Sequence, residues 1–260
     1  MTTSVAQGAT PDMNSGSRRG DRLRLFIEPA IVLALIAGVL VWAFTRDLDD
    51  IEARNINFAV LTSLTWEHIQ ITAMVTLIVL LVAVPLGILV TRPWARLIAP
   101  VVLIIANIGQ AAPAIGILVL FFLWTGQTGF WIVVLPTALY ALLPVLRNTM
   151  IGIQQVDPSL LEAGRGVGMS NLTVLRRIEL PLAVPFVLAG LRTSLVLAVG
   201  VATLAFFVGG GGLGELIDAG YKLGRPSVLV VGAALAMALA LLVDWLGGLA
   251  ERLLGPKGLR

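Results

Sequence analysis

Long runs of apolar residues that contain no charge dominate this chain. The runs cover residues 29–45, 69–91, 97–146, 193–214 and 226–243. A helix of about 20 mainly apolar residues spans the hydrocarbon core of a bilayer, and each run approaches or exceeds that length. The pattern therefore predicts an all-α, polytopic membrane protein.

The third run, residues 97–146, is too long for a single span. The sequence TGQTG at residues 125–129 lies inside this run and is typical of a turn. We therefore expect two helices joined by a tight turn. The next span is expected to begin near Val184, after Pro181, and to include Arg192, which brings the predicted total to six spans.

The composition agrees with a membrane protein and excludes several kinds of chemistry. Hydrophobic residues make up 58% of the 260 residues and charged residues 13%, whereas soluble domains carry about 45 to 50% and about 25%. The chain has no cysteine and a single histidine, His68. Disulfides, thiolate nucleophiles, and metal sites built on cysteine or on several histidines are therefore excluded. No cofactor is expected within the chain.

The positions of lysine and arginine predict the orientation, because positive residues near the ends of spans are retained in the cytoplasm. With the N-terminus inside, the cytoplasmic segments hold most of the 18 basic residues: Arg18, Arg19, Arg22, Arg24, Arg92, Arg96, Arg147, Arg165, Arg176, Arg177, Arg252, Lys257 and Arg260. The external segments hold only Arg46, Arg54, Lys222 and Arg225. Both termini are therefore expected in the cytoplasm.

Both ends of the chain are predicted to be tails. Residues 1–28 are rich in serine, glycine, threonine and arginine, which is typical of a disordered segment. Residues 251–260 form the predicted cytoplasmic tail at the other end. The Arg18-Arg19 pair invites interpretation as a twin-arginine export signal, but Asp21 stands where such a signal needs an apolar residue. Residues 29–45 are therefore predicted to remain as the first transmembrane helix.

A long stretch of mixed polarity, residues 147–183, lies on the predicted cytoplasmic side. Loops of this length inside a compact domain are usually functional. Asp157 followed by a proline is typical of a helix start, and Glu162 lies near the positive end of that helix. The helix is expected to end at the glycines Gly164, Gly166 and Gly168.

A second short helix is expected after these glycines. Ser170 or Asn171 is available as its N-cap, and the helix is predicted to run through Ile178. Pro181 and Pro185 are expected to break it. A helix, a glycine turn and a second helix would together form a small rigid projection below the membrane.

The spacing of residues in this loop resembles the EAA loop of ATP-binding-cassette importer permeases. The family pattern is E-A-A, three residues, G, nine residues, I, one residue, L-P. The matching positions here are Glu162, Ala163, Gly164, Gly168, Ile178, Leu180 and Pro181. Only the third departs from the pattern, because Gly164 replaces alanine. Glycine costs about 1 kcal/mol relative to alanine in a helix interior, so the departure concerns local stiffness.

In that family the loop docks in a groove of the cytoplasmic ATPase subunit. The resemblance therefore implies that this loop, from Asp157 onward, couples the ATPase to the membrane helices. The alternative is a surface loop that only connects two spans. The junction of the loop with the fifth span favours coupling, because a force on the loop would move a membrane helix.

Four other segments resemble the permeases that import glycine betaine, carnitine, choline and related osmoprotectants. They are residues 110–114, 140–149, 188–194 and 210–214, and the whole resemblance covers residues 60–250, the predicted permease domain. The first segment departs somewhat from its relatives, which leaves the substrate range open. A permease for methionine or another amino acid is the alternative.

The resemblance also implies a fold, a location and partners. The fold is the six-helix permease of type I importers, in the bacterial inner or plasma membrane. The partners are a second permease subunit, identical or homologous, two cytoplasmic ATPase subunits that hold ATP and Mg²⁺, an extracytoplasmic substrate-binding protein, a small solute and membrane lipid. Nucleic acid is not expected as a partner.

The chain itself lacks the sequence patterns of an enzyme. It has no G-x-x-x-x-G-K-[ST] loop, so ATP hydrolysis must reside on another polypeptide, and its spans hold no Ser/His pair, HExxH or paired carboxylates. A GxGxxG pattern in residues 209–214 follows a membrane helix and not a strand, so dinucleotide binding is rejected. A hinge or a packing role is expected instead for Gly210, Gly211, Gly212 and Gly214.

Polar residues inside spans are candidates for function, because they are costly in lipid. Asn107 and Gln110 lie three positions apart, ahead of Pro113, so a kinked helix would present both to a path between subunits. The equally weighted alternative is that they hydrogen-bond to neighbouring helices. Arg192 is expected to have a structural partner such as a helix C-terminus, and His68 is expected to be a satisfied residue at the membrane boundary.

Overall fold

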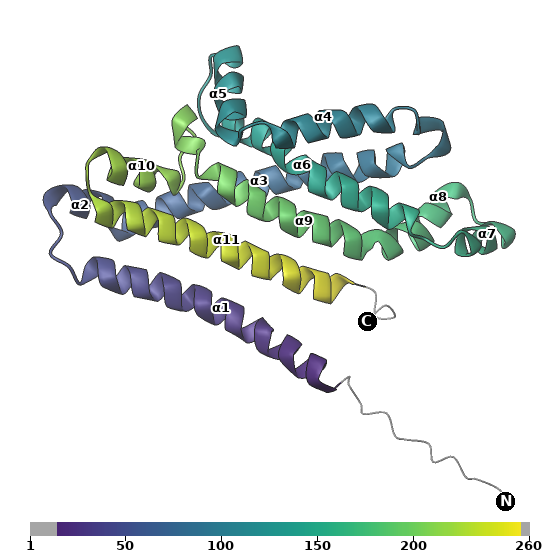
Figure 1. Cartoon of the computed structure of the whole chain (residues 1–260), viewed down its shortest axis with the longest axis horizontal. Coiled ribbons are helices and arrows are strands. Elements are labelled where there is room, and N and C mark those ends of the chain that lie inside the picture. Colours follow the sequence, from purple (N-terminus) through teal and green to yellow (C-terminus); the bar gives the residue numbers. More distant parts are fainter. Residues whose placement is uncertain (1–14, 256–260) are drawn as a thin grey trace, which may run out of the picture.

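The described part of the chain is helical, and its long helices lie side by side in a bundle (Figure 1). The computed structural model describes the backbone of residues 15–255 and the side chains of residues 26–255. The α-helices are α1 (Ser15–Phe44), α2 (Asp50–Asn55), α3 (Phe58–Val90), α4 (Ala99–Ala111), α5 (Ala114–Thr125), α6 (Phe130–Gln154), α7 (Pro158–Gly166), α8 (Asn171–Val174), α9 (Leu180–Ala202), α10 (Gly214–Lys222) and α11 (Pro226–Leu254). The shorter elements are the 3₁₀ helices η1 (Pro93–Ala95) and η3 (Ala205–Val208) and the π-helical turn η2 (Leu175–Glu179).

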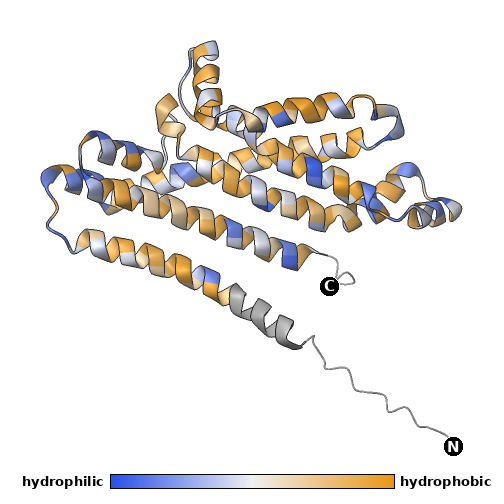
Figure 2. Cartoon of the chain, in the orientation of Figure 1, coloured by the Kyte–Doolittle hydropathy of each residue, from blue (hydrophilic) through white to orange (hydrophobic). Residues whose placement is uncertain are grey.

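Five helical segments in the described residues are long and apolar enough to cross a membrane: residues 26–44 of α1, all of α3 and α6, the run that ends with α9, and α11. The pair α4 and α5 passes the same test together, with a bend of 102° between its halves. Counting this pair as one broken span gives the six spans that the sequence predicts. Figure 2 shows hydrophobic residues along the long helices and hydrophilic residues concentrated toward their ends.

The third span is broken, where the sequence predicted a kinked but continuous helix. Pro113 lacks an N–H and disfavours helical backbone in the residue before it. Ala112 is accordingly extended, with a ψ of 145°, and α5 starts only after Pro113. The predicted turn at residues 125–129 separates α5 from α6, and Gly126 ends α5 with a φ of 65°.

The fifth span is longer than predicted, because α8, η2 and α9 form one continuous helical run, Asn171–Ala202. The expectation that Pro181 and Pro185 break the helix is therefore wrong. In a regular α-helix a proline ring clashes with the carbonyl four residues earlier. Here the turn before Pro181 is widened, and the Leu180 N–H bonds to the Leu175 oxygen five residues back. The wider turn accommodates the proline without ending the helix.

The first span lies at the edge of the bundle, where α1 packs mainly against α11. α1 begins at Ser15, so residues 15–28 are helical where the sequence indicated a disordered tail. Residues 1–14 and 256–260, which belong to the two predicted tails, lie outside the described residues. At the other end, α11 extends to Leu254, into the predicted C-terminal tail.

The centre of the bundle is formed by α3, α6 and α9, which share one hydrophobic core. Its fully buried side chains include Ile71, Val79, Val133, Val145 and Ala198. Glycine brings α6 and α9 close together, because a Cβ added to Gly190 would lie 2.7 Å from the carbonyl oxygen of Pro144. Close backbone approach at small residues is a principal source of helix association in lipid.

Candidate functional site

α7 and α8 project from one end of the bundle, the end at which α1 begins and α11 finishes (Figure 1). The predicted coupling residues are found together in and around this projection. They are Asp157, Glu162, Ala163, Gly164 and Gly168 in or beside α7, and Ile178, Leu180 and Pro181 where η2 joins α9. We call the segment from Asp157 to Glu179 the coupling loop.

Asp157 starts α7 as its N-cap. Its Oδ1 accepts a hydrogen bond from the Ser159 N–H at 2.8 Å, and Pro158 takes the first helical position. The hydrogen bond from the Ser159 backbone stabilises the carboxylate and lowers the pKa of Asp157 below its ordinary value of 3.8. The cap therefore stays charged at neutral pH and fixes the start of the coupling loop.

Gly168 ends α7 in the left-handed conformation, with a φ of 86°. The Met169 N–H bonds to the Gly164 oxygen at 3.0 Å, and the Gly168 N–H bonds to the Arg165 oxygen at 2.9 Å. These two bonds make a Schellman motif, in which glycine is favoured because a side chain is strained at positive φ. Backbone geometry thus explains the glycine at this position of the pattern.

The second helix of the coupling loop is capped by Ser170, which settles the choice between Ser170 and Asn171. The Ser170 Oγ accepts a hydrogen bond from the Thr173 N–H at 3.3 Å. α7 packs against this helix through Gly164, which is buried. A Cβ added to Gly164 would lie 2.8 Å from the Ile178 Cδ1. The glycine that departs from the family pattern therefore permits a close contact between the two helices.

Apolar side chains are exposed on the outer surface of the coupling loop. Leu160 is 46% exposed, Val167 77% and Leu172 55%. Arg165, between the first two in sequence, is exposed as well. Exposed apolar residues that are rimmed by polar ones mark contact sites for other proteins. Leu160, Val167 and Leu172 are exposed apolar side chains of the kind that a partner protein covers.

One charged contact at the base of the coupling loop was missed from sequence. Glu179, between the matched positions Ile178 and Leu180, is 3% exposed and forms an ion pair with Arg92, just after α3. The Arg92 Nη1 donates to the Glu179 Oε1 at 3.1 Å, and Nη2 donates to Oε2. The available signal was an acidic residue at the edge of an apolar span, where an unpaired charge is costly.

The three predicted path residues lie along α4 and at its bend with α5. The Asn107 Oδ1 accepts a hydrogen bond from Arg147 at 2.9 Å, and its Nδ2 donates to the Leu103 oxygen at 2.6 Å. These contacts favour the packing alternative for Asn107. Gln110 is half-buried in the last turn of α4, and Pro113 is exposed at the bend.

Residues 209–214, which follow η3 and which we call the glycine segment, are hydrogen-bonded to the first part of α3. The Glu67 Oε2 accepts a hydrogen bond from the Gly212 N–H at 3.0 Å. His68 accepts from the Leu213 N–H at 3.3 Å through Nδ1, so Nε2 carries the proton and donates to the Val199 oxygen at 3.1 Å. His68 is fully buried and both of its ring nitrogens have partners, which agrees with the expectation of a satisfied residue.

The four predicted glycines of this segment each meet a geometric demand. Gly211 and Gly212 have φ values of 79° and 87°, which disfavour any side chain. A Cβ added to Gly214 would lie 1.9 Å from the Thr203 oxygen. A Cβ on Gly210 would lie 2.2 Å from a valine side chain of α6. These features support a packing role at the turn between α9 and α10.

Arg192 joins α9 to the last span. Its Nε and Nη2 donate to the two carboxylate oxygens of Asp244, each at 2.6 Å, and its Nη1 lies 3.9 Å from Glu251. The structural partner of Arg192 is thus a carboxylate on α11, whereas the sequence had indicated a helix C-terminus. A two-pronged contact of this kind fixes the relative position of both helices.

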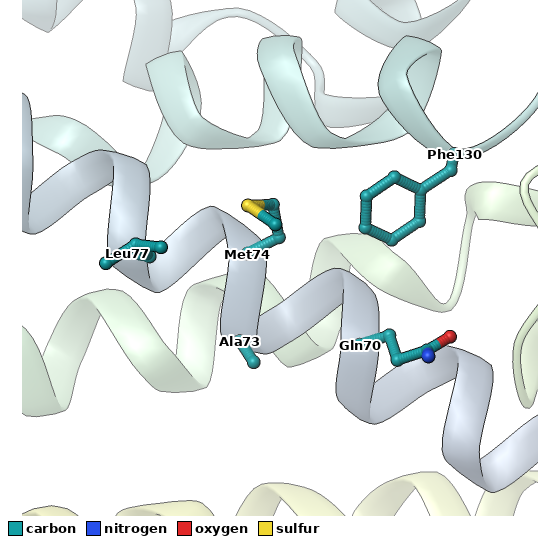
Figure 3. Close-up of a pocket in the computed structure, with 5 residues that line it drawn as sticks. All are labelled: Gln70, Ala73, Met74, Leu77 and Phe130. Atoms are coloured by element: carbon teal, nitrogen blue, oxygen red, sulfur yellow. The ribbon is translucent and has the colours of Figure 1, made fainter.

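An open cavity of about 600 Å³ lies beside α3 at the start of α6 (Figure 3). Its lining residues are Gln70, Ala73, Met74, Leu77 and Phe130. Gln70 supplies an amide and Phe130 an aromatic ring, and none of the five side chains is charged. The volume is in the range of small-molecule sites. The α3 residues that line this cavity lie at the middle of that helix.

Comparison with known proteins agrees with this arrangement. The family described as "binding-protein-dependent transport system inner membrane component" matches residues 83–255. The match includes the coupling loop, the glycine segment and the last span. The chain belongs to this family, and it is therefore a multi-pass membrane subunit of a transport system.

Individual relatives can be compared with this chain by name. The chain is similar to the choline transport system permease protein OpuBB of Bacillus subtilis, with 41% identity over 196 residues, which are 75% of this chain and 89% of the relative. The glycine betaine/carnitine/choline permease OpuCB of the same organism is 40% identical over the same shares. The osmoprotectant import permease OsmW of Salmonella typhimurium is 36% identical, over 82% of this chain and 100% of the relative.

Solved structures share the fold. A structure of the MetNI methionine ABC transporter in an inward-facing conformation matches with a TM-score of 0.65 and 25% identity, over 75% of this chain and 96% of that chain. An amino acid ABC transporter solved with histidines matches with a TM-score of 0.64 and 19% identity, over 79% and 99%. The all-α permease fold of type I importers is thereby established for this chain.

Proposed function

We propose that this chain is the permease subunit of an ATP-driven importer of glycine betaine, choline, carnitine or a similar osmoprotectant. The observation that carries the proposal is the coupling loop, with its capped start, its Schellman turn and its exposed apolar surface. The names of the relatives that are about 40% identical support the substrate class. Methionine and other amino acids are less favoured, because those transporters are only 19 to 25% identical.

In this proposal the coupling loop and both termini face the cytoplasm. The exposed arginines of the loop, Arg165, Arg176 and Arg177, support this orientation, because positive residues remain on the cytoplasmic side. The surface of Leu160, Val167 and Leu172 docks on an ATPase subunit. ATP and Mg²⁺ bind to that separate chain, and this chain needs no cofactor. A second permease subunit and an extracytoplasmic binding protein complete the complex.

The local structure of the loop suits the transmission of force. The N-cap at Asp157 and the glycine turn at Gly168 hold α7 rigidly, and Gly164 keeps it against the second helix. That second helix continues through η2 into α9 without interruption. A displacement of α7 by the ATPase therefore reaches the fifth span directly, and this shifts the balance between the inward-open and outward-open states.

The cavity beside α3 is the proposed place for the solute on its way through the membrane. The ring of Phe130 attracts a quaternary ammonium group through its π-electron face. The amide of Gln70 is a donor and an acceptor for a carboxylate or a hydroxyl group. Because no charge lines the cavity, the solute is held weakly, as a path with a separate binding protein requires.

The test is transport by the complete complex, with ATPase and binding protein, in proteoliposomes. We expect ATP-dependent uptake of labelled glycine betaine, choline or carnitine, and no uptake of labelled methionine. Uptake of methionine alone would overturn the substrate class. Uptake without any need for ATP would overturn the proposed role in an ATP-driven importer.

A further inference from the structure

The ion pair between Arg92 and Glu179 occupies the joint between the coupling loop and the membrane helices. Glu179 is the last residue of the π turn η2, and it is 3% exposed. Its two carboxylate oxygens receive the two prongs of the Arg92 guanidinium. A buried carboxylate without a partner carries a large desolvation penalty. Separating Glu179 from Arg92 is therefore costly, so we expect the two residues to stay paired when the coupling loop moves.

Arg92 is in turn fixed to the end of α3. Its N–H bonds to the Leu89 oxygen at 3.0 Å, and its Nε donates to the Ile88 oxygen at 3.3 Å. A cation at the C-terminal end of a helix is also favoured by the helix dipole. The guanidinium is thus shared between the last turn of α3 and the base of the coupling loop, which lie 87 positions apart in the sequence.

The other ion pairs among the described residues connect different parts of the molecule. Arg192 with Asp244 and with Glu251 joins α9 to α11, Arg225 with Asp49 joins two loops, and Lys222 with Asp218 lies within α10. Within the described part of the chain, the pair of Arg92 and Glu179 is the ion pair that joins the coupling loop to another span.

The opposite end of α3 is also tied to the fifth span. His68 donates to the Val199 oxygen of α9, and Glu67 and His68 accept backbone N–H groups of the glycine segment that follows. α3 is therefore attached at both ends to the chain that begins in the coupling loop. A movement of the loop acts on α3 at its near end through the ion pair, and on the glycine segment at its far end through α9.

We propose that Arg92 and Glu179 are positioning residues for coupling: their ion pair makes α3 move together with the coupling loop. This inference rests on the proposed function of the loop. It assigns the transmission of movement to two side chains that lie outside the proposed contact with the ATPase. It also implies that α3 moves during the transport cycle. Without the pair, the ATPase would still move α7 and α9, but the near end of α3 would no longer follow the coupling loop, and only its far end would stay attached to α9 through His68.

The first experiment measures transport and ATP hydrolysis together in the reconstituted complex. Glu179→Gln keeps the shape of the side chain and removes its charge. We expect the number of solute molecules imported per ATP hydrolysed to fall about tenfold, the size of a typical coupling between sites. The matched control is Lys222→Gln, which breaks an ion pair on α10 and is expected to leave this ratio unchanged. An unchanged ratio in Glu179→Gln would overturn the inference.

A second experiment restores the charge chemically and separates positioning from folding. The chain has no cysteine, so Arg92→Cys introduces a single thiol. Modification with a methanethiosulfonate that carries an ammonium group is expected to recover the transport per ATP. Reagents of similar size with a neutral or a sulfonate group are expected not to recover it. Equal effects of all three reagents would show that the charge at this position has no role in coupling.

A third measurement keeps the inference testable even if the solute has been misidentified. Trp94 is 74% exposed in the turn just after α3, two positions from Arg92, and Trp94→Cys reports movement at the near end of α3. In the complex, the rate of maleimide labelling is expected to change between the nucleotide-free state and the state trapped with ATP and vanadate. Adding Glu179→Gln should abolish that change. A change that persists would refute the inference, whereas failure of uptake of all tested solutes would affect only the proposed function.

Discussion

Gly166 and Gly168 are two positions apart, yet only one of them needs to be glycine. Gly168 has a φ of 86°, whereas Gly166 lies at the end of α7 with helical backbone and with open space around its Cα. Left-handed backbone is strained for every residue with a Cβ. The sequence alone does not distinguish the two glycines. The backbone geometry shows that Gly168 is needed for the turn and that Gly166 is not.

Replacing Gly168 by alanine is therefore expected to destabilise the coupling loop. The cost of placing a Cβ in the left-handed region is about 1 to 2 kcal/mol. Thermal unfolding of the purified protein and hydrogen exchange in α7 would show the loss. Gly166→Ala is the control, because alanine is favoured in a helix and meets no neighbour there. Equal protection of α7 in both variants would contradict the Schellman assignment.

The N-cap of α7 predicts a pH response. The pKa of Asp157 is lowered in the folded protein, so its contribution to stability is fully present above the ordinary value of 3.8 and is lost as the pH falls through the lower folded value. The protection of the α7 amides, which is the exchange rate relative to the intrinsic rate at the same pH, is expected to be independent of pH near neutrality and to fall only in acid. Asp157→Asn should remove this acid response. A response centred near pH 6 would have to come from another group.

At the scale of helices, contacts between backbones hold the core together. Gly190 of α9 faces the Pro144 oxygen of α6, while a Cβ added to Gly200 of the same helix would meet no neighbouring atom within 4 Å. Helices in lipid gain little from burying apolar surface, since the lipid is equally apolar. Close contact at small residues is therefore the main term that keeps α6 against α9.

These two glycines give a matched test of that contact. Gly190→Ala is expected to push α9 away from α6 and to lower stability by about 1 to 3 kcal/mol, the usual cost of overpacking. Gly200→Ala is expected to be neutral or slightly stabilising, since alanine favours the helix. Unfolding in mixed detergent micelles measures both variants. A loss of equal size in both would mean that helix packing is not responsible.

The elements could be predicted from the sequence to the extent that local chemistry decides them. Charge-free length indicated six spans, and capping residues indicated the two helices of the coupling loop. The effects of Pro113 and Pro181 on their helices were harder to predict, because they depend on how the surrounding backbone adapts. At Pro113 the helix breaks by 102°, while at Pro181 the helix continues through a widened turn. The sequence pattern alone does not distinguish these two outcomes.

Contacts between distant residues were the part that the sequence did not reveal. Glu179 and Arg92 are separated by 87 positions, and His68 and Leu213 by 145. Each residue considered alone carries only the signal of a polar group that needs a partner. The identity of the partner follows from the packing of α3 against α9. For the same reason, Arg192 was expected to have a partner such as a helix C-terminus, and its partner is the Asp244 carboxylate.

At the scale of the whole molecule, short helices outside the long spans lie at both ends of the bundle. The coupling loop lies at one end, and α2 and α10 lie at the other (Figure 1). Arg165 is exposed at the first end, and Tyr221 is 79% exposed at the second. Because the chain contains no cysteine, single thiols introduced at these positions can be labelled without background.

This division predicts the labelling of intact cells by a membrane-impermeant maleimide. Tyr221→Cys is expected to react from outside. Arg165→Cys is expected to react only after the membrane has been made permeable, because the coupling loop faces the cytoplasm in the proposed orientation. The opposite pattern would reverse the orientation and would place the loop out of reach of a cytoplasmic ATPase.

The π turn at Leu175–Glu179 has a consequence for how this loop can vary in evolution. Each residue advances a helix by about 100° and 1.5 Å. Because α8, η2 and α9 are one continuous rod, inserting or deleting one residue in the turn would rotate α7 around the axis of the fifth span. The loop would then present a different side to its neighbour. A substitution in this segment leaves the rotation of α7 about that axis unchanged, so the number of residues in the turn fixes the direction in which α7 faces.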